Sequence, residues 1–449
     1  MTELKRELGL VGATNIGIGN IIGAGIFVLS GMAAGLAGPG VVLSFVIAGF
    51  ITLLTALSCA ELSSFITDTG GPINYAKKAF GTFWGYLVGW MSIFDYVVGA
   101  AAVSIGFGAY LLLLLAVPVN TILIVAIATA LPLALLVLNS RGIKEAAGLN
   151  SVMVLVKIIG LLVFIVVGAA CILSSGDFSN YAPMFPNGLS GIFSGTAIVF
   201  FAFIGFNTIT TVSEEVKDPG RTIPRAILLS VTISTLLYVA VAAVEVGLVR
   251  WDILGGSPAP LEVALGAATS SALLVDLIAF SAMLAISSVV MSSLMGSSRS
   301  LLAMARQKTL PSALSRISKN GVPKVTVITS GVAIASIVLM TGGNIEWLAS
   351  AFNFGTLLTF IVINLSLIRL RTTMPDHPRS FRVPLCPYVP ALAIVFSIIL
   401  IGFLNLNAVL ITSAWIALGL AIYVFYQRRL GAVQESEAVE FLAAEVMEA

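Results

Sequence analysis

Charge is scarce in this sequence. Lys, Arg, Asp and Glu together make up 10% of its 449 residues, whereas 58% of the residues are hydrophobic and the mean hydropathy is +1.07. This composition excludes a water-soluble globular protein. The formal net charge of +2 is too small to indicate a nucleic-acid partner. The sequence is instead rich in long apolar runs, which predict a lipid bilayer as the surrounding medium.

Histidine and cysteine are scarcer still. The single histidine, His377, lies in a charged loop between Pro375 and Pro378, where we expect it to be solvated. The three cysteines are too few and too scattered for a disulfide framework or a metal cluster. An intramembrane enzyme would need catalytic groups that this sequence does not offer, because no H-E-x-x-H or G-x-G-D motif occurs. We therefore expect no enzyme, no metal and no cofactor.

Apolar runs of helix length recur along the whole chain, separated by short loops. They predict an all-α polytopic membrane protein with twelve transmembrane helices. The first six helices are expected at about 10–36, 39–66, 82–115, 119–139, 150–174 and 191–216. The other six are expected at about 225–248, 270–305, 324–341, 345–368, 388–405 and 408–427.

The basic residues are distributed unevenly among the loops. All but three of the Lys and Arg residues fall in loops on one side of the predicted membrane, and only Arg250 falls in a loop on the other side. Lys157 and Arg299 lie within or near the ends of spans. Since cytoplasmic loops are enriched in basic residues, we expect cytoplasmic N- and C-termini and a multi-pass protein of the cell membrane. The acidic segment 431–449 is expected to be a cytoplasmic tail.

Glycines interrupt the first predicted helix. The stretch "IGIGNIIGAGIF", residues 16–27, has four glycines and an asparagine inside an apolar run. Glycine weakens a helix, and freed backbone groups cannot face lipid. The glycines therefore indicate either close packing against another helix or a discontinuous helix lining a cavity. Span six is also interrupted, at Gly205 and Asn207, and matching breaks in two halves are typical of inverted-repeat transporters.

Two broken helices suit a zwitterionic substrate. The amides of Gly23, Ala24 and Gly25 would open a half-helix whose positive dipole end attracts a carboxylate. The carbonyls of Ile21 and Ile204 would accept hydrogen bonds from an ammonium group. We expect walls of the pocket to come from an aromatic run in span six, although an aromatic trio in a membrane helix more often packs or faces lipid: Phe201, Phe203 and Phe206.

Four motifs in order resemble those of the amino acid–polyamine–organocation (APC) transporters. They are "GNIIGAGIF" in span one, Ser58 to Gly81 after span two, Phe200 to Ile227 around span six, and Gly296 to Pro323 after span eight. The pattern is most similar to proton-coupled archaeal and bacterial amino acid transporters and to cationic amino acid transporter-like members. The resemblance implies a LeuT-like fold, a five-plus-five inverted repeat with broken helices 1 and 6, and amino acid transport by alternating access.

The resemblance also implies a domain plan and a substrate site. A single transporter domain is expected over 1–430, with repeat one at about 10–174, repeat two at about 191–368 and two added helices at about 388–427. Substrate-backbone contacts are carried over to Ile21, Gly23, Ala24 and Gly25, and the wall and gate to Phe201, Phe203, Ile204 and Gly205. Asn207 stands where many relatives carry an acidic residue, so no basic substrate and no acid-dependent gate is assigned there.

Lys157 lies within an apolar run, "VMVLVKIIGLLVF". An unpaired ammonium in a membrane helix costs at least ~2.5–3.5 kcal/mol, so this charge needs a partner, a change of protonation state or a path to the surface. It resembles the fifth-helix lysine of proton-coupled relatives, which occupies the place of a sodium ion. That implies proton coupling with carbonyls near Gly17 and Ile18 and with Ser287 or Ser288. The alternative is a lysine that snorkels to the cytoplasmic face.

Other acidic residues are expected to play different parts. Asp95, on one helical face with Ser92 and beside Tyr96, would select a cationic substrate, accept a proton, or pair with Lys157. Glu61, Glu214 and Glu215 are expected in inner-gate or structural salt bridges. Glu245 and Asp276 are expected to be solvated near the outer surface.

These features predict a secondary active transporter that carries small neutral or apolar amino acids together with protons. An exchanger of one amino acid or amine for another is the alternative, and a non-transporting amino acid sensor on the same scaffold is a further one. The expected partners are the amino acid, protons and the lipid bilayer. The sequence does not indicate an oligomeric state.

Overall fold

The protein is described by a computed structural model that covers residues 8–67, 70–141, 143–306, 309–316, 318 and 323–426, with side chains left undescribed at 24, 140–152 and 211–215. The named secondary-structure elements in these ranges are all helices. The one β pairing among them is an isolated bridge between Leu8 and Val216. The predicted acidic tail, 431–449, lies outside the described residues.

Every predicted span coincides with helical structure, but the helices differ in length. Ten described stretches are long and apolar enough to cross a membrane, rather than twelve. Two apolar helices are shorter: α1 (Leu10–Ile21) stops at the break in the first span, and α15 (Tyr388–Ile401) has 14 residues. One of the ten, Gly25–Phe65, includes both α2 (Ala24–Ala37) and α3 (Val41–Phe65), because the short 3-10 turn η1 (Gly38–Gly40) joins them directly.

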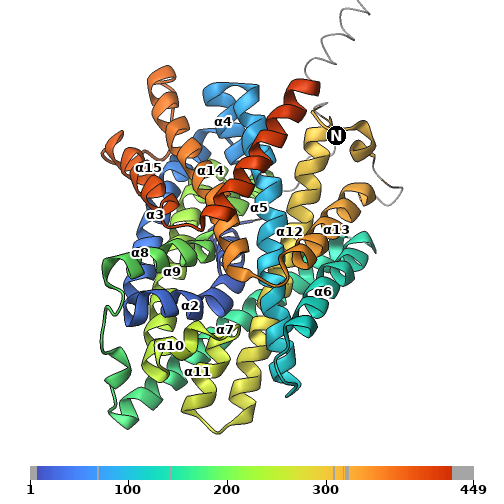
Figure 1. Cartoon of the computed structure of the whole chain (residues 1–449). Helices are drawn as coiled ribbons and strands as arrows, with labels where there is room; N and C mark the ends of the chain where they lie inside the picture. The colour runs from blue at the N-terminus through green and yellow to red at the C-terminus, as the bar shows by residue number, and fades with distance from the viewer. Residues whose placement is uncertain are drawn as a thin grey trace, which may run out of the picture.

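The remaining long helices follow the predicted order. They are α5 (Thr82–Leu114), α6 (Thr121–Arg141), α7 (Ile143–Ser175), α9 (Pro219–Leu248), α12 (Ala272–Arg306), α13 (Lys324–Thr341), α14 (Ile345–Thr373) and a last helix at Leu406–Tyr426. Short elements cover the ends: α4 (Pro72–Phe80), η2 (Ser179–Tyr181), α10 (Trp251–Gly255), α11 (Pro260–Ala268) and η5 (Ser312–Ser315). Helix α4 lies at the top of the molecule, whereas α10 and α11 lie at the bottom (Figure 1).

Both predicted breaks are present. Between α1 and α2, Ile22 and Gly23 leave the helix, and Gly23 has an extended backbone with φ −112° and ψ −156°. The sixth span begins as α8 (Gly188–Val199) and continues as two 3-10 segments, η3 (Phe200–Phe203) and η4 (Phe206–Glu215). Ile204 and Gly205 lie between them, and the φ of +129° at Gly205 is open to glycine and strained for other residues. We did not expect the second half of this span to be a 3-10 helix.

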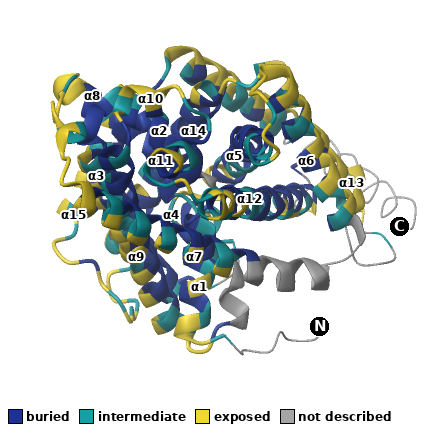
Figure 2. Ribbon diagram, turned by 90° about the horizontal axis from the view of Figure 1, so that it is seen from below, coloured by how far each residue is buried: buried dark blue, intermediate teal, exposed yellow. Residues whose placement is uncertain are grey.

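Burial follows from the packing of these helices. Buried residues gather at the centre on α2, α5, α12 and α14, and exposed ones on α8 and α13 at the rim (Figure 2). The exposed side chains of peripheral helices are themselves apolar, as on α7 with Leu155, Ile159, Leu162 and Val166. Such a continuous apolar outer face is what a membrane protein presents to lipid.

Candidate functional site

The two helix breaks lie against each other. A Cβ atom added to Gly205 would lie 2.6 Å from the Asn20 carbonyl oxygen and 3.1 Å from the Ile21 nitrogen. On the other side of the break, a Cβ on Gly25 would lie 2.6 Å from the Cα of Ala202. Backbone therefore meets backbone where the first and sixth spans unwind, and glycine is needed on both sides. The expectation of a discontinuous first helix facing the sixth is confirmed.

Tyr238, on α9, connects the two breaks. Its hydroxyl oxygen lies 2.6 Å from the carbonyl oxygen of Ile21 and 3.0 Å from that of Ala202, and its one proton is donated to one of them. The side chain is fully buried. Sequence reasoning missed this residue, because a tyrosine within an apolar helix has no distinguishing neighbours. The hydroxyl therefore lies between the backbones of the two breaks, and the Ile21 carbonyl also accepts from the Gly23 amide at 2.7 Å.

The aromatic residues of the sixth span point to different neighbours. Phe201 lies against Phe352 of α14, with ring centroids 4.4 Å apart. Phe203 packs against Tyr238 at 5.2 Å, on the side of α3 and α9. Phe206 packs on Phe360, with centroids 5.7 Å apart. The structure therefore does not bring Phe201 and Phe203 to one common wall, and it adds Phe352 beside Phe201.

Asparagines connect the sixth span to its neighbours. The Asn207 Oδ1 atom accepts a hydrogen bond from the Cys59 thiol of α3, with a donor–acceptor distance of 3.5 Å. Asn353, on α14, is fully buried, and its amide donates to the carbonyl of Ala197 at 2.6 Å. This carbonyl belongs to the last turn of α8, immediately before the helix becomes irregular. Asn353 was not singled out from the sequence.

Lys157 binds the broken first helix. The side chain is fully buried on α7, and its ammonium donates a hydrogen bond to the carbonyl of Gly19. The predicted carbonyls near Gly17 and Ile18 are one or two residues away from the one observed. A lysine with no exposed surface does not snorkel. Within the described part of the chain no ion pair involves Lys157, so the Gly19 carbonyl is the contact that the structure records for its charge.

The serines predicted beside Lys157 both lie on α12 and are buried or nearly so. The Ser287 hydroxyl donates to the Met283 carbonyl of its own helix at 2.8 Å. This local bond directs Ser287 along α12. The Ser288 side chain is buried, with 2% of its surface exposed.

Asp95 faces α14. Thr356 donates its hydroxyl to the Asp95 Oδ2 atom at 3.2 Å, and the Oδ1 atom is buried without a hydrogen-bond partner among the described residues. The expectation of a pair with Lys157 is wrong, because Lys157 is directed at α1 instead. Ser92 donates to the Val88 carbonyl of its own helix, and Tyr96 packs against Gly296 of α12.

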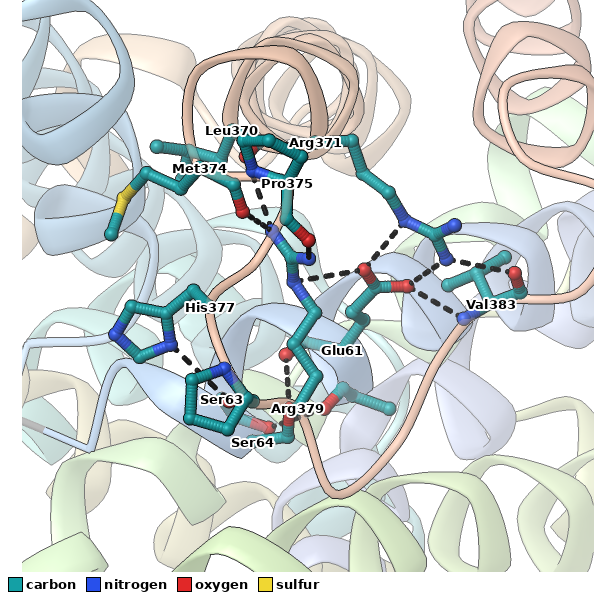
Figure 3. Close-up of polar contacts among 12 residues, drawn as sticks. Glu61, Ser63, Ser64, Leu370, Arg371, Met374, Pro375, His377, Arg379 and Val383 are labelled. Carbon is teal, nitrogen blue, oxygen red and sulfur yellow. Dashed lines mark hydrogen bonds and ion pairs between the residues drawn. The ribbon is translucent and has the colours of Figure 1, made fainter.

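Glu61, at the end of α3, accepts contacts from two arginines (Figure 3). Arg371 of α14 forms a two-pronged contact with it at 2.7 and 2.6 Å, and Arg379 of the following loop approaches at 3.3 Å. The backbone amide of Val383 donates to the same carboxylate at 2.6 Å. The expected salt bridge at Glu61 is confirmed. Burial lowers the pKa of the Arg379 guanidinium, and the charge of Glu61 opposes that shift.

The other charged or titratable residues singled out from the sequence are placed only in part. The side chains of Glu214 and Glu215 lie outside the described residues. His377 is partly buried rather than solvated, because its ring packs on Phe65 with centroids 5.2 Å apart. Asp276 is exposed, as expected.

Glu245 contradicts its predicted environment. The expectation was a solvated residue near the outer end of its helix, yet the side chain has no exposed surface. The reason is that α2 covers this face of α9, and Ser30 of α2 donates a hydrogen bond to the Glu245 carboxyl at 3.1 Å. A helix-end position therefore does not imply solvation when another segment packs over it.

A cavity of about 360 Å³ lies at the end of the molecule that carries α10, away from the helix breaks. Its lining combines α2, α10 and the start of α14: Met32, Gly35, Leu36, Trp251, Asp252, Gly255 and Glu346. At the breaks themselves, Gly205 and Gly25 pack directly on backbone.

Comparison with known protein families identifies the family of the chain. A family model described as "Amino acid permease" matches residues 12–429. The chain belongs to the amino acid permease family. It is therefore a membrane transporter and not an enzyme, and the resemblance to the APC transporters is confirmed.

Three relatives show the range of this permease family. The chain is 35% identical to the branched-chain amino acid permease BcaP of Bacillus subtilis over 446 residues, covering 95% of this chain and 94% of that protein. It is 33% identical to a methylthioribose transporter of the same organism over 447 residues, covering 95% and 94%. It is 32% identical to the vacuolar cationic amino acid transporter 4 of Arabidopsis thaliana over 391 residues, covering 83% and 64%.

Proposed function

We propose that this permease is a secondary active transporter that carries small neutral or apolar amino acids, with branched-chain amino acids as its main substrates, together with protons. The observation that carries the proposal is the contact between the two helix breaks, with Lys157 bound to the first of them at Gly19. The name of the Bacillus relative, a branched-chain amino acid permease, supports the apolar substrate. The phenylalanines around the breaks and the neutral Asn207 support it as well.

The substrate backbone would occupy the junction of the breaks. Its carboxylate would accept hydrogen bonds from the amides of Gly23, Ala24 and Gly25, at the positive end of α2. Its ammonium would bind the carbonyls of Ile21 and Ile204. In the substrate-free structure the Ile21 oxygen accepts from the Gly23 amide at 2.7 Å, and this bond would open when the amide turns to the carboxylate and the oxygen to the ammonium. The Tyr238 hydroxyl has two carbonyls within reach, so it can turn fully to Ala202. The apolar side chain would then lie towards Phe201 and Phe352.

The proton would be carried at Lys157. As an ammonium, Lys157 donates to the Gly19 carbonyl and holds α7 against α1. As a neutral amine, it forms a weaker hydrogen bond, because bonds from charged donors are roughly twice as strong as neutral ones. Loss of the proton therefore loosens α1, the segment that carries half of the substrate site. Protonation and substrate access are coupled in this way, as alternating access requires.

The whole molecule is arranged for this role. We propose twelve spans, with α1 and α2 forming the first and α15 the eleventh, in a five-plus-five inverted repeat within one domain over 1–430. The lysine-bearing α4 lies at the end opposite α10, which follows Arg250 (Figure 1). By the positive-inside rule the α4 end faces the cytoplasm, and both termini lie on that side of the cell membrane.

Uptake by purified protein in liposomes tests the proposal. Labelled leucine is offered under a pH gradient, a sodium gradient, or with unlabelled leucine inside, for the wild type, Lys157→Ala and the exposed control Lys324→Ala. We expect accumulation driven by the pH gradient in the wild type and the control. In Lys157→Ala it should fall by roughly 10- to 100-fold, corresponding to a lost charged hydrogen bond of about 1.5–3 kcal/mol.

The same assay separates the alternatives. Flux that appears only with leucine inside would make the protein an exchanger and leave Lys157 a structural charge. Accumulation driven by sodium would contradict the proton proposal, as would wild-type coupling in Lys157→Ala. Saturable binding without any flux would instead indicate a sensor.

A further inference from the structure

Glu245 is a buried carboxyl group far along α9 from the helix breaks. Ser30 donates to its Oε1 atom at 3.1 Å. Its Oε2 atom is buried and has no hydrogen-bond partner among the described residues. None of the ion pairs in the described ranges includes Glu245. An ionised carboxylate in this position would lose its hydrating water, and the protein would replace only a small part of it with hydrogen bonds.

A second carboxyl group lies in the same region. Glu262 of α11 also has a buried Oε2 atom without a hydrogen-bond partner among the described residues. Tyr110 of α5 lies close enough to feel the charge of both Glu245 and Glu262, and its hydroxyl donates to the Phe27 carbonyl of α2 at 2.5 Å. Segments α2, α5, α9 and α11 therefore meet around two carboxyl groups. We call this set, Ser30, Tyr110, Glu245 and Glu262, the outer acid cluster.

Among the described residues, the groups around the outer acid cluster supply no cation. The neighbouring titratable or polar groups on the elements packed against it are Ser30 of α2, Tyr110 of α5, Tyr181 of η2, Glu262 of α11 and Asp276 of α12. Helix α7 faces α9 at this level with Gly168 against Val244 and Leu248. Burial raises the pKa of Glu262 to about 7, with a smaller contribution from the charge of Asp276. For Glu245, full burial without a neighbouring cation among the described residues favours the protonated carboxyl over the ionised one.

We propose that the outer acid cluster is a proton-binding site, in which Glu245 holds the proton and fastens α2 to α9 through Ser30. In its neutral form, Glu245 accepts the Ser30 hydrogen bond and needs no further hydration. In its ionised form, it requires water, so the contact between α2 and α9 opens. Helix α2 carries Ser30 near its middle and, at its N-terminus, the amides assigned to the substrate. The site is separate from Lys157 and does not require that transport be driven by protons.

Infrared spectroscopy of the substrate-free protein in lipid tests this site directly. The C=O stretching band of a protonated carboxyl is recorded while the pH is raised. Wild type should show a band at neutral pH that Glu245→Gln lacks, whereas the exposed control Glu346→Gln and the variant Lys157→Ala should retain it. A band that is unchanged in Glu245→Gln, or that sodium ions abolish at constant pH, would overturn the proposal.

A second variant keeps the test decisive if Glu245→Gln does not fold. In Ser30→Ala the Glu245 carboxyl remains, but its hydrogen-bond donor is gone. The C=O band should then move to higher wavenumber than in the wild type, because a hydrogen bond to the carbonyl oxygen weakens the C=O bond. An unchanged band in Ser30→Ala would show that the protonated carboxyl is not the one bound to Ser30, and the proposal would fail.

Discussion

Gly205 has no room for a side chain. Its φ of +129° is in a region that is strained for other residues. A Cβ atom there would lie 2.6 Å from the Asn20 oxygen and 3.1 Å from the Ile21 nitrogen, and backbone atoms cannot move aside as a flexible side chain does. The residue therefore allows the backbones of the two breaks to lie in direct contact.

We expect Gly205→Ala to destabilise the protein and to abolish leucine uptake. The strained backbone alone costs on the order of 1–3 kcal/mol, and the contact with α1 adds to it. The measurement is the thermal unfolding midpoint together with leucine uptake. The matched control is Gly266→Ala, since Gly266 of α11 has nothing within 4 Å and no strained φ. Normal uptake by Gly205→Ala would show that the breaks need not touch.

The site could be predicted from the sequence only where a residue is unusual for its surroundings. The glycines of the first span and Lys157 stand out in apolar helices. The first helix breaks among these glycines, and Lys157 binds a carbonyl one or two residues from the predicted ones. Tyr238 could not be found, because its role depends on which carbonyls of other segments lie beside its hydroxyl. Glu245 was placed wrongly, because its burial comes from α2, more than two hundred residues earlier in the chain.

At the scale of helices, α3 is fastened to α14 at two levels. Near the C-terminal end of α3, Glu61 binds Arg371 and the Val383 amide. About one turn earlier in α3, Ser58 donates to the Asn364 side chain at 2.6 Å. Buried polar contacts between helices restrict how the helices can slide. The loop after α14 is therefore packed against this end of the bundle through Val383 and Arg379.

We expect Glu61→Gln to destabilise this end of the molecule. Glu61 is fully buried, and removing one partner of a buried ion pair costs up to ~3–5 kcal/mol because the arginines lose their counter-charge. The unfolding midpoint should fall clearly below that of the control Asp218→Asn. Asp218 pairs with Arg221 at 4.0 Å on the surface, where such pairs contribute little. Equal midpoints for the two variants would contradict a stabilising role for Glu61.

Helix positions were easier to predict than helix types. Long apolar runs with basic loops predicted the order of the helices and most of their bounds within a few residues, although α7 and α9 begin seven and six residues earlier than expected. The second half of the sixth span, however, is a 3-10 helix, and nothing in "FNTITTVSEE" distinguishes it from an α-helix. Its geometry depends on packing against α1 and α9, which local sequence does not report.

At the scale of the whole molecule, three polar centres connect helices that are distant in the sequence. The outer acid cluster joins α2 to α9, the helix breaks and Lys157 lie further in, and the Glu61 contacts join α3 to α14. Each centre connects segments that are far apart in the sequence. Alternating access by relative movement of such segments would have to break the outer and inner contacts at different times.

The most direct test of the central claim is an experimental structure of the protein in lipid with leucine bound. We expect leucine at the junction of the breaks, with its carboxylate at the amides of Gly23, Ala24 and Gly25 and its ammonium near the Ile21 carbonyl. The Tyr238 hydroxyl should then point to Ala202. Leucine bound instead in the cavity beside Trp251, with the helix breaks still in contact and empty, would contradict the proposed substrate site.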